Sequence, residues 1–339
     1  YNGSIANVRI DYSTDGWVSE HNIVESTSCS AKTFQWTNIP DDITNSARVR
    51  ISNVLDSTVK SESPVNFKIV GVLEVTSPTA ASRWEVGVPA AINWNVTGSI
   101  ANVRIDYSAN NGGSWTNIIA QVAASAKTTS WTPTPESVSL QALIKVSDFN
   151  DSTVFDISEQ FHVKARFDVS SPSNGLIWPV DTDHDIEWTT YGVVPTVRID
   201  YCTDGVGADW KPITMSTSNN SPYRWTVDDD ISSTCKIKVS DTRDPEAFGV
   251  SSGLFKIRGN VQVLSPSDAG ISWIVGESHD ITWETTGTIP TVKIEYSING
   301  GGAYTTLSAS YDGPTGSMPW TVWDTLSTNC LVRISDTRD

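Results

Sequence analysis

One seven-residue motif recurs four times at a nearly constant spacing. It begins at Asn7, Asn102, Thr196 and Thr291, which gives steps of 95, 94 and 95 residues. In the copy Asn102–Ser108 (NVRIDYS) apolar residues alternate with charged ones, which is the period of a half-buried β-strand with a charged outer face. The sequence is therefore predicted to be an array of one repeated unit.

The repeat divides the 339 residues into four units, each close to the usual size of a domain. The predicted domains are residues 1–70, 71–165, 166–259 and 260–339. Only a few residues separate consecutive units, which is too short for a flexible coil linker, and a fairly stiff rod is expected.

The second unit is complete and shows the order of its elements. Short runs of alternating or apolar residues are separated by prolines and by the Asn/Gly turn at Asn110–Gly113, and no run has the period of a helix. About seven short strands in about 95 residues are typical of an immunoglobulin-like β-sandwich. The predicted fold class is all-β, with four such domains in tandem.

The first and last units are predicted to be incomplete. Aligned on the motif, Tyr1 corresponds to Val96 and Asp339 to Asp244, so the first unit lacks N-terminal strands and the last lacks a C-terminal strand. Uncovering a sandwich interior costs about 1.5–3 kcal/mol per large side chain and leaves unpaired strand edges. We expect the same protein to complete both units, as further repeats of a longer chain or as strands donated by a neighbouring copy.

The charge of the chain argues against several classes of partner. The formal net charge is −16 with a pI near 4.6, and the basic residues are spread singly. The sequence has no basic stripe that could follow the phosphate backbone of a nucleic acid. No apolar run approaches the roughly 20 residues that are needed to cross a bilayer. Neither nucleic acid binding nor membrane insertion is expected.

The fourth unit carries the fullest version of a pattern that occurs in all four. Its residues are Ser265-Pro266, Gly270, Trp273, Gly276, Trp283, Val292–Ser297, Trp320-Thr321 and Ser327–Asp336. The pattern resembles the tandem immunoglobulin-like repeats of large secreted or surface-attached bacterial proteins, and more distantly the N-terminal domain of fungal Ser/Thr-rich cell-wall proteins. The resemblance implies an extracellular array that serves as a spacer, an adhesive arm or a filament.

Thirteen of the 14 tryptophans fall into four columns that recur at one position of each repeat. A column at apolar phase favours core packing over a sugar-binding platform. The predicted core tryptophans are Trp94, Trp188 and Trp283. Trp323 stands outside the columns, and its position leaves a separate surface role open.

Acidic turns with side chains three residues apart recur at Asn53/Asp56, Asp148/Asp151, Asp241/Asp244 and Asp336/Asp339. In an extracellular array such turns could hold Ca²⁺, with Asp148, Asp151, Asp241 and Asp244 as ligands. Capping of the turns by their own side chains is the favoured interpretation, because no D-x-D-x-D run occurs. No cofactor is therefore expected, with Ca²⁺ kept as an alternative.

Two covalent modifications are candidates. A Cys202–Cys235 disulfide would join neighbouring strands, although strict alternation places one thiol outward and the other inward. N-glycosylation sequons occur at Asn2, Asn95, Asn150 and Asn219.

No nucleophile elbow, HExxH or Cys–His pair is present, and enzymatic activity is not expected. The leading hypothesis is a structural repeat protein of an extracellular bacterial filament, surface appendage or giant adhesin stalk. The alternative is a carbohydrate-binding or accessory module of a secreted polysaccharide-degrading protein. Expected partners are copies of the chain or its flanking repeats, with surface glycans as a further candidate.

Overall fold

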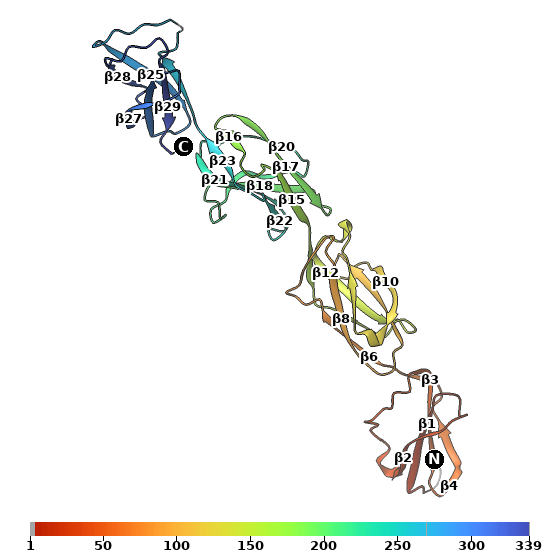
Figure 1. Ribbon diagram of the computed structural model, residues 1–339. Coiled ribbons are helices and arrows are strands. Elements are labelled where there is room, and N and C mark those ends of the chain that lie inside the picture. Colours follow the sequence, from red (N-terminus) through yellow and green to blue (C-terminus); the bar gives the residue numbers. More distant parts are fainter. Residues whose placement is uncertain (1–3, 269, 339) are drawn as a thin grey trace. The chain divides into compact units, whose positions relative to one another are not determined.

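The computed structural model describes residues 4–268 and 270–338. These residues form β-strands and three short 3-10 helices, at Cys29–Ala31, Ala124–Ala126 and Pro135–Ser137. The chain divides into two compact units, Tyr1–Lys164 and Ala165–Asp339, and Figure 1 shows strands throughout both. Each unit contains two of the four sequence repeats, which are called repeats 1 to 4. The fold is all-β, with tandem immunoglobulin-like repeats, as the sequence predicted.

Repeat 2 is a two-sheet sandwich. One sheet has the order β11-β8-β6 and the other the order β10-β9-β12-β14-β7, with β13 paired to β12. Strand β7 is parallel to β14, and every other pairing in the repeat is antiparallel. The bounds are β6 Val72–Ser77, β7 Arg83–Glu85, β8 Ala90–Thr97, β9 Asn102–Ser108, β10 Thr116–Ala123, β11 Thr128–Trp131, β12 Ser139–Asp148, β13 Phe155–Ile157 and β14 Phe161–Lys164.

Repeat 3 has the same topology. Its sheets have the orders β15-β17-β20 and β16-β23-β21-β18-β19, β22 pairs with β21, and β16 is parallel to β23. The bounds are β15 Arg166–Ser171, β16 Ile177–Pro179, β17 Asp183–Tyr191, β18 Thr196–Cys202, β19 Lys211–Ser218, β20 Tyr223–Thr226, β21 Ser232–Asp241, β22 Phe248–Val250 and β23 Phe255–Arg258.

Repeat 4, over the residues that the structure describes, has two three-stranded sheets, β24-β25-β28 and β27-β26-β29. Its strands are β24 Asn260–Ser265, β25 Ser278–Thr286, β26 Thr291–Ser297, β27 Thr305–Asp312, β28 Ser317–Thr321 and β29 Leu331–Asp336.

Repeat 1, over its described residues, has one sheet of order β2-β1-β3-β4, with β5 paired to β3. Its strands are β1 Asn7–Ser13, β2 His21–Ser28, β3 Thr44–Asn53, β4 Asp56–Glu62 and β5 Phe67–Ile69.

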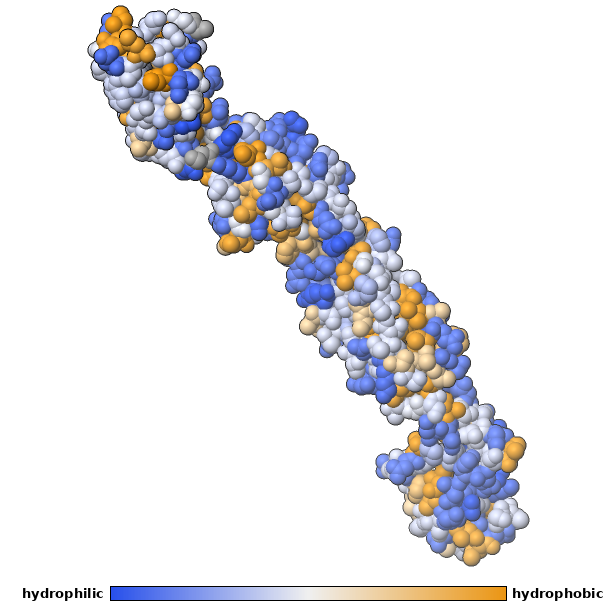
Figure 2. Space-filling view, viewed as in Figure 1, coloured by the Kyte–Doolittle hydropathy of each residue, from blue (hydrophilic) through white to orange (hydrophobic). Residues whose placement is uncertain are grey.

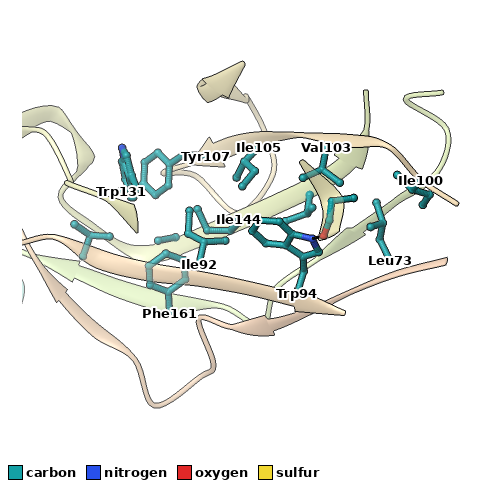
Figure 3. Packing of buried hydrophobic residues seen from close by; sticks show 14 of the residues in the cluster. Leu73, Ile92, Trp94, Ile100, Val103, Ile105, Tyr107, Trp131, Ile144 and Phe161 are labelled. Carbon is teal, nitrogen blue, oxygen red and sulfur yellow. Dashed lines mark hydrogen bonds between the residues drawn. The ribbon is translucent and has the colours of Figure 1, made fainter. Parts of the chain in front are cut away.

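The core of repeat 2 lies between its two sheets. Figure 3 shows Trp94 of β8 and Ile105 of β9 directed into the same space from opposite sheets. Trp94 is 1% exposed, and its indole Nε1 donates a 3.0 Å hydrogen bond to the carbonyl oxygen of Ala124. Trp188 and Trp283 are 5% and 2% exposed at the same place in repeats 3 and 4. One tryptophan therefore fills the centre of each two-sheet repeat.

The acidic residue of the recurring motif is buried, which corrects the expected charged outer face. Asp106 is 3% exposed, and its carboxylate accepts hydrogen bonds from Arg104 Nε at 2.9 Å and Asn117 Nδ2 at 3.1 Å. The amine of Lys145 lies 3.9 Å from the same carboxylate and 4.5 Å from the ring of Trp115. Strand β9 is therefore buried on both faces at its end, and the alternation of apolar and charged residues does not predict burial there.

Candidate functional site

In each compact unit an aspartate of one repeat binds a turn of the next repeat. Asp41 accepts hydrogen bonds from the backbone N–H of Ser99 at 2.7 Å and from its hydroxyl at 2.5 Å. Asp229 accepts the same two bonds from Thr288, at 2.8 Å and 2.6 Å. These charge-assisted bonds are stronger than bonds between neutral groups. The bonds to Ser99 hold the pKa of Asp41 below its ordinary value.

An isoleucine two residues after each aspartate continues the contact. Ile43 packs against the core cluster of repeat 2, and Ile231 packs against that of repeat 4. The neighbouring turn contributes Ile100 and Ile289, which are 7% and 2% exposed. Apolar burial thus accompanies the hydrogen bonds in both units.

A glycine lies where the two repeats approach most closely. A Cβ at Gly71 would lie 2.7 Å from the carbonyl oxygen of Thr97, and a Cβ at Gly259 would lie 2.9 Å from that of Thr286. We call these contacts the 1–2 joint and the 3–4 joint, with residues Asp41, Ile43, Gly71, Ser99 and Ile100 in the first and Asp229, Ile231, Gly259, Thr288 and Ile289 in the second. Sequence reasoning missed both joints, although the Gly-Ser/Thr turn and the aspartate recur at matching positions.

Basic side chains of the protein neutralise the acidic turns. Lys68 forms a 2.6 Å ion pair with Asp151, and this hydrogen bond is the main cause that lowers the pKa of Asp151 to about 2. The Asp148 carboxylate accepts a 2.8 Å bond from the backbone N–H of Asn150. Both carboxylates of this turn in repeat 2 therefore have partners within the protein.

An arginine takes this role in repeats 3 and 4. Arg243 pairs with Asp241 at 2.8 Å and also donates to the carbonyl oxygen of Val193. Arg338 pairs with Asp336 at 2.6 Å and donates to the carbonyl oxygen of Thr288 in the 3–4 joint. Asp244 caps the N–H of Glu246 at 3.0 Å. In these two turns a guanidinium therefore pairs with the first carboxylate.

Repeat 1 has an apolar groove of about 510 Å³ on its sheet. Its lining includes Val8, Ile10, Ile51 and Val59. Ile51 is 44% exposed, whereas its counterpart in repeat 2, Val146, is fully buried beneath the facing sheet. The groove therefore corresponds to the space that β6 and β8 fill in repeat 2.

The tryptophans offer little surface for stacking against a sugar. Of the fourteen tryptophans, only Trp323 is exposed, at 45%. Its ring lies against Tyr296 and Trp320, with centroid separations of 5.4 Å and 6.4 Å. Small apolar patches between polar residues are all that the face in Figure 2 presents.

The candidate disulfide is not formed, because Cys202 and Cys235 are both free, buried thiols. Cys202 is paired with Lys236 in the ladder, so Cys235 is displaced by one residue. Burial raises the pKa of both thiols.

Three of the four sequons lie within the described residues, and Asn2 lies outside them. Asn95 and Asn150 are exposed. Asn219 uses both ends of its amide, since its oxygen accepts from Trp188 Nε1 at 2.8 Å and its nitrogen donates to the carbonyl oxygen of Val194 at 3.0 Å. The first two sequons are therefore accessible to a glycan, and the third is engaged in the core.

No helix in the described part of the chain is long and apolar enough to cross a membrane.

No protein-family model matches the sequence, and no curated protein matches it. Similar solved structures include the fibronectin(III)-like modules of Clostridium thermocellum CbhA, at 16% identity over 55% of this chain and 94% of that one, with a TM-score of 0.20. The N-terminal eight Ig domains of Down Syndrome Cell Adhesion Molecule are 13% identical over 92% of this chain and 48% of that one, with a TM-score of 0.28. Three N-terminal domains of the bacteriophage RB49 Highly Immunogenic Outer Capsid protein are 10% identical over 76% and 91%, with a TM-score of 0.26. Likenesses this low say nothing about function.

Proposed function

We propose that this chain is a structural repeat protein of an extracellular bacterial filament, surface appendage or giant adhesin stalk, either self-associating or part of a longer array. The observation that carries the proposal is the joint. The same aspartate, isoleucine, glycine and hydroxyl residue join repeat 1 to repeat 2 and repeat 3 to repeat 4.

A joint of this kind fixes the orientation of one repeat on the next. Two hydrogen bonds to one carboxylate set a direction, and the buried isoleucines add apolar contact on the same side. These contacts hold consecutive repeats in series, which is what a structural role requires. That use of side chains favours a structural role.

The carbohydrate-binding alternative has less support. Stacking on sugars needs exposed aromatic faces, and the recurring tryptophans are buried or half-buried. Affinity electrophoresis through soluble polysaccharides tests this alternative directly, and a strong retardation that Trp323→Ala abolishes would favour it over the structural role.

Two measurements test the structural role. Antibodies raised against the purified chain should label intact cells of the source organism, and label that appears only after permeabilisation would contradict the proposal. Calorimetry should show that repeats 3 and 4 melt together, and that Asp229→Asn with Thr288→Val separates their transitions. Asp280→Asn, which removes an equal charge from the exposed face of β25, is the matched control and should leave the melt unchanged.

A further inference from the structure

Repeat 4 carries, uncovered, the surface that repeats 1 and 3 use in their joints. Asp324 and Leu326 occupy the positions of Asp229 and Ile231, 95 residues further along the chain. Leu326 is 87% exposed, whereas Ile231 is packed in the 3–4 joint. Among the described residues, the exposed carboxylate of Asp324 has no hydrogen-bond or ion-pair partner.

Three of the bonds that hold the loop carrying this surface are the same in both repeats. Ser327 Oγ donates to the carbonyl oxygen of Ile298 at 2.5 Å, as Ser232 Oγ donates to that of Thr203 at 2.7 Å. The backbone bonds match as well: Val322 to Glu277 at 3.0 Å corresponds to Val227 to Thr182 at 3.0 Å, and Thr325 to Trp323 at 2.8 Å corresponds to Asp230 to Asp228 at 2.8 Å. These bonds hold the loop within repeat 4 itself.

The joints also identify what this surface fits. In both of them the aspartate binds a Gly-Ser/Thr-Ile turn at the start of a motif strand. The same Gly-Ser-Ile sequence occurs at residues 3–5, in a stretch that is identical to residues 98–108 over eleven positions. Ser4 is exposed, and Ile5 is half-buried.

We propose that the Asp324–Leu326 surface of one copy binds the Ser4–Ile5 turn of a second copy, head to tail, in the manner of the 1–2 joint. The carboxylate of Asp324 accepts the N–H and the hydroxyl of Ser4, and Leu326 covers Ile5. This inference rests on the proposed function and names the partner within it.

The chemistry sets the kind of assembly. The two surfaces differ, so the contact is heterologous, and copies joined in this way can form a series. Within a chain the covalent link supplies an effective concentration of about millimolar, which the contact between separate copies lacks. The association is therefore weak and concentration-dependent.

Sedimentation velocity of the full 339-residue chain, from micromolar to millimolar protein, tests the proposal. The average sedimentation coefficient should rise with concentration. Asp324→Asn and Ser4→Pro should each weaken association by at least about tenfold, since each removes charge-assisted bonds. Asp280→Asn, with the same charge change on another face of repeat 4, should associate like the wild type. Melting curves show whether each variant is folded.

A mixture of two variants gives the sharper result. Ser4→Pro retains an intact Asp324, and Asp324→Asn retains an intact Ser4, so the mixture should form pairs that do not grow. A wild type that stays monomeric at millimolar concentration, an unchanged Asp324→Asn variant, or a mixture without pairs would each overturn the inference. Such a failure is distinct from failure of the proposed function, because the calorimetric test of the 3–4 joint acts within one chain.

Discussion

Repeats 1 and 2 share one strand sequence and bury it differently. Residues 3–13 and 98–108 are identical, yet Val103 is fully buried whereas Val8 is half-buried at the edge of a groove. The difference comes from β6 and β8, which carry Leu73, Ile92 and Trp94 across the sheet in repeat 2. Alternation in a sequence thus says which face of a strand is apolar, while its burial depends on what faces it.

The largest expected effect is that of truncating Trp94, which packs between the two sheets of repeat 2. Trp94→Ala should destabilise this repeat by about 3–5 kcal/mol, because a large buried side chain leaves a cavity between the sheets. Urea denaturation followed by near-ultraviolet circular dichroism measures the loss. The comparison variant, Trp323→Ala, removes a ring that is 45% exposed and should cost clearly less. Equal effects would mean that Trp94 does not support the sandwich.

Removing a single methylene compares the covered sheet of repeat 2 with the open sheet of repeat 1 directly. Ile144→Val in β12 should cost about 0.5–1.5 kcal/mol, because Ile144 is fully buried. Ile51→Val in β3 removes the same methylene from a side chain that is 44% exposed. This change should cost only about a few tenths of a kcal/mol. The same denaturation experiment reads both, and the comparison fails if the Ile51 variant loses as much stability as the Ile144 variant.

Acid should weaken the ion pair between Lys68 and Asp151, which joins repeat 1 to repeat 2. Asp151 pairs with Lys68, and its pKa is lowered from 3.8 to about 2. A depressed carboxyl pKa gives stability that is present above pH 4 and is lost as the pH falls toward 2. Lys68→Met should flatten this part of the pH profile of thermal unfolding. A profile of equal steepness in the variant would exclude the pair as its cause.

The smallest expected effect is that of Ca²⁺. The acidic turns already use backbone N–H groups and basic side chains, so millimolar Ca²⁺ should barely change the melting temperature of either unit. A rise of many degrees would overturn turn capping at Asp148 and Asp241 and revive a metal site.

The sequence predicted the fold class well because it depends on local pattern. The period-two strands, the Asn110–Gly113 turn and the tryptophan columns each reflect short-range geometry. The burial of Asp106 and the bonds of Asp41 to Ser99 could not be predicted in this way, because each depends on groups brought together from distant positions. The Cys202 thiol was misjudged for the same reason, since strict alternation ignores a second layer over the strand. The domain boundaries and the extracellular location remain predictions.

The parallel pairing of β7 with β14, and of β16 with β23, has a mechanical consequence. In each case one strand lies near the start of a repeat and its partner near the end, and both run in the same direction. Tension on the two ends of the repeat therefore slides these strands past each other along their length, which loads their hydrogen bonds in shear. Force spectroscopy on a single chain should find repeats 2 and 3 more resistant to extension than variants with proline at Trp84 or Trp178. Hydrogen bonds that are sheared together share the load, whereas hydrogen bonds that are peeled from one end break one after another. A short parallel pair of strands can therefore resist the extension of its repeat.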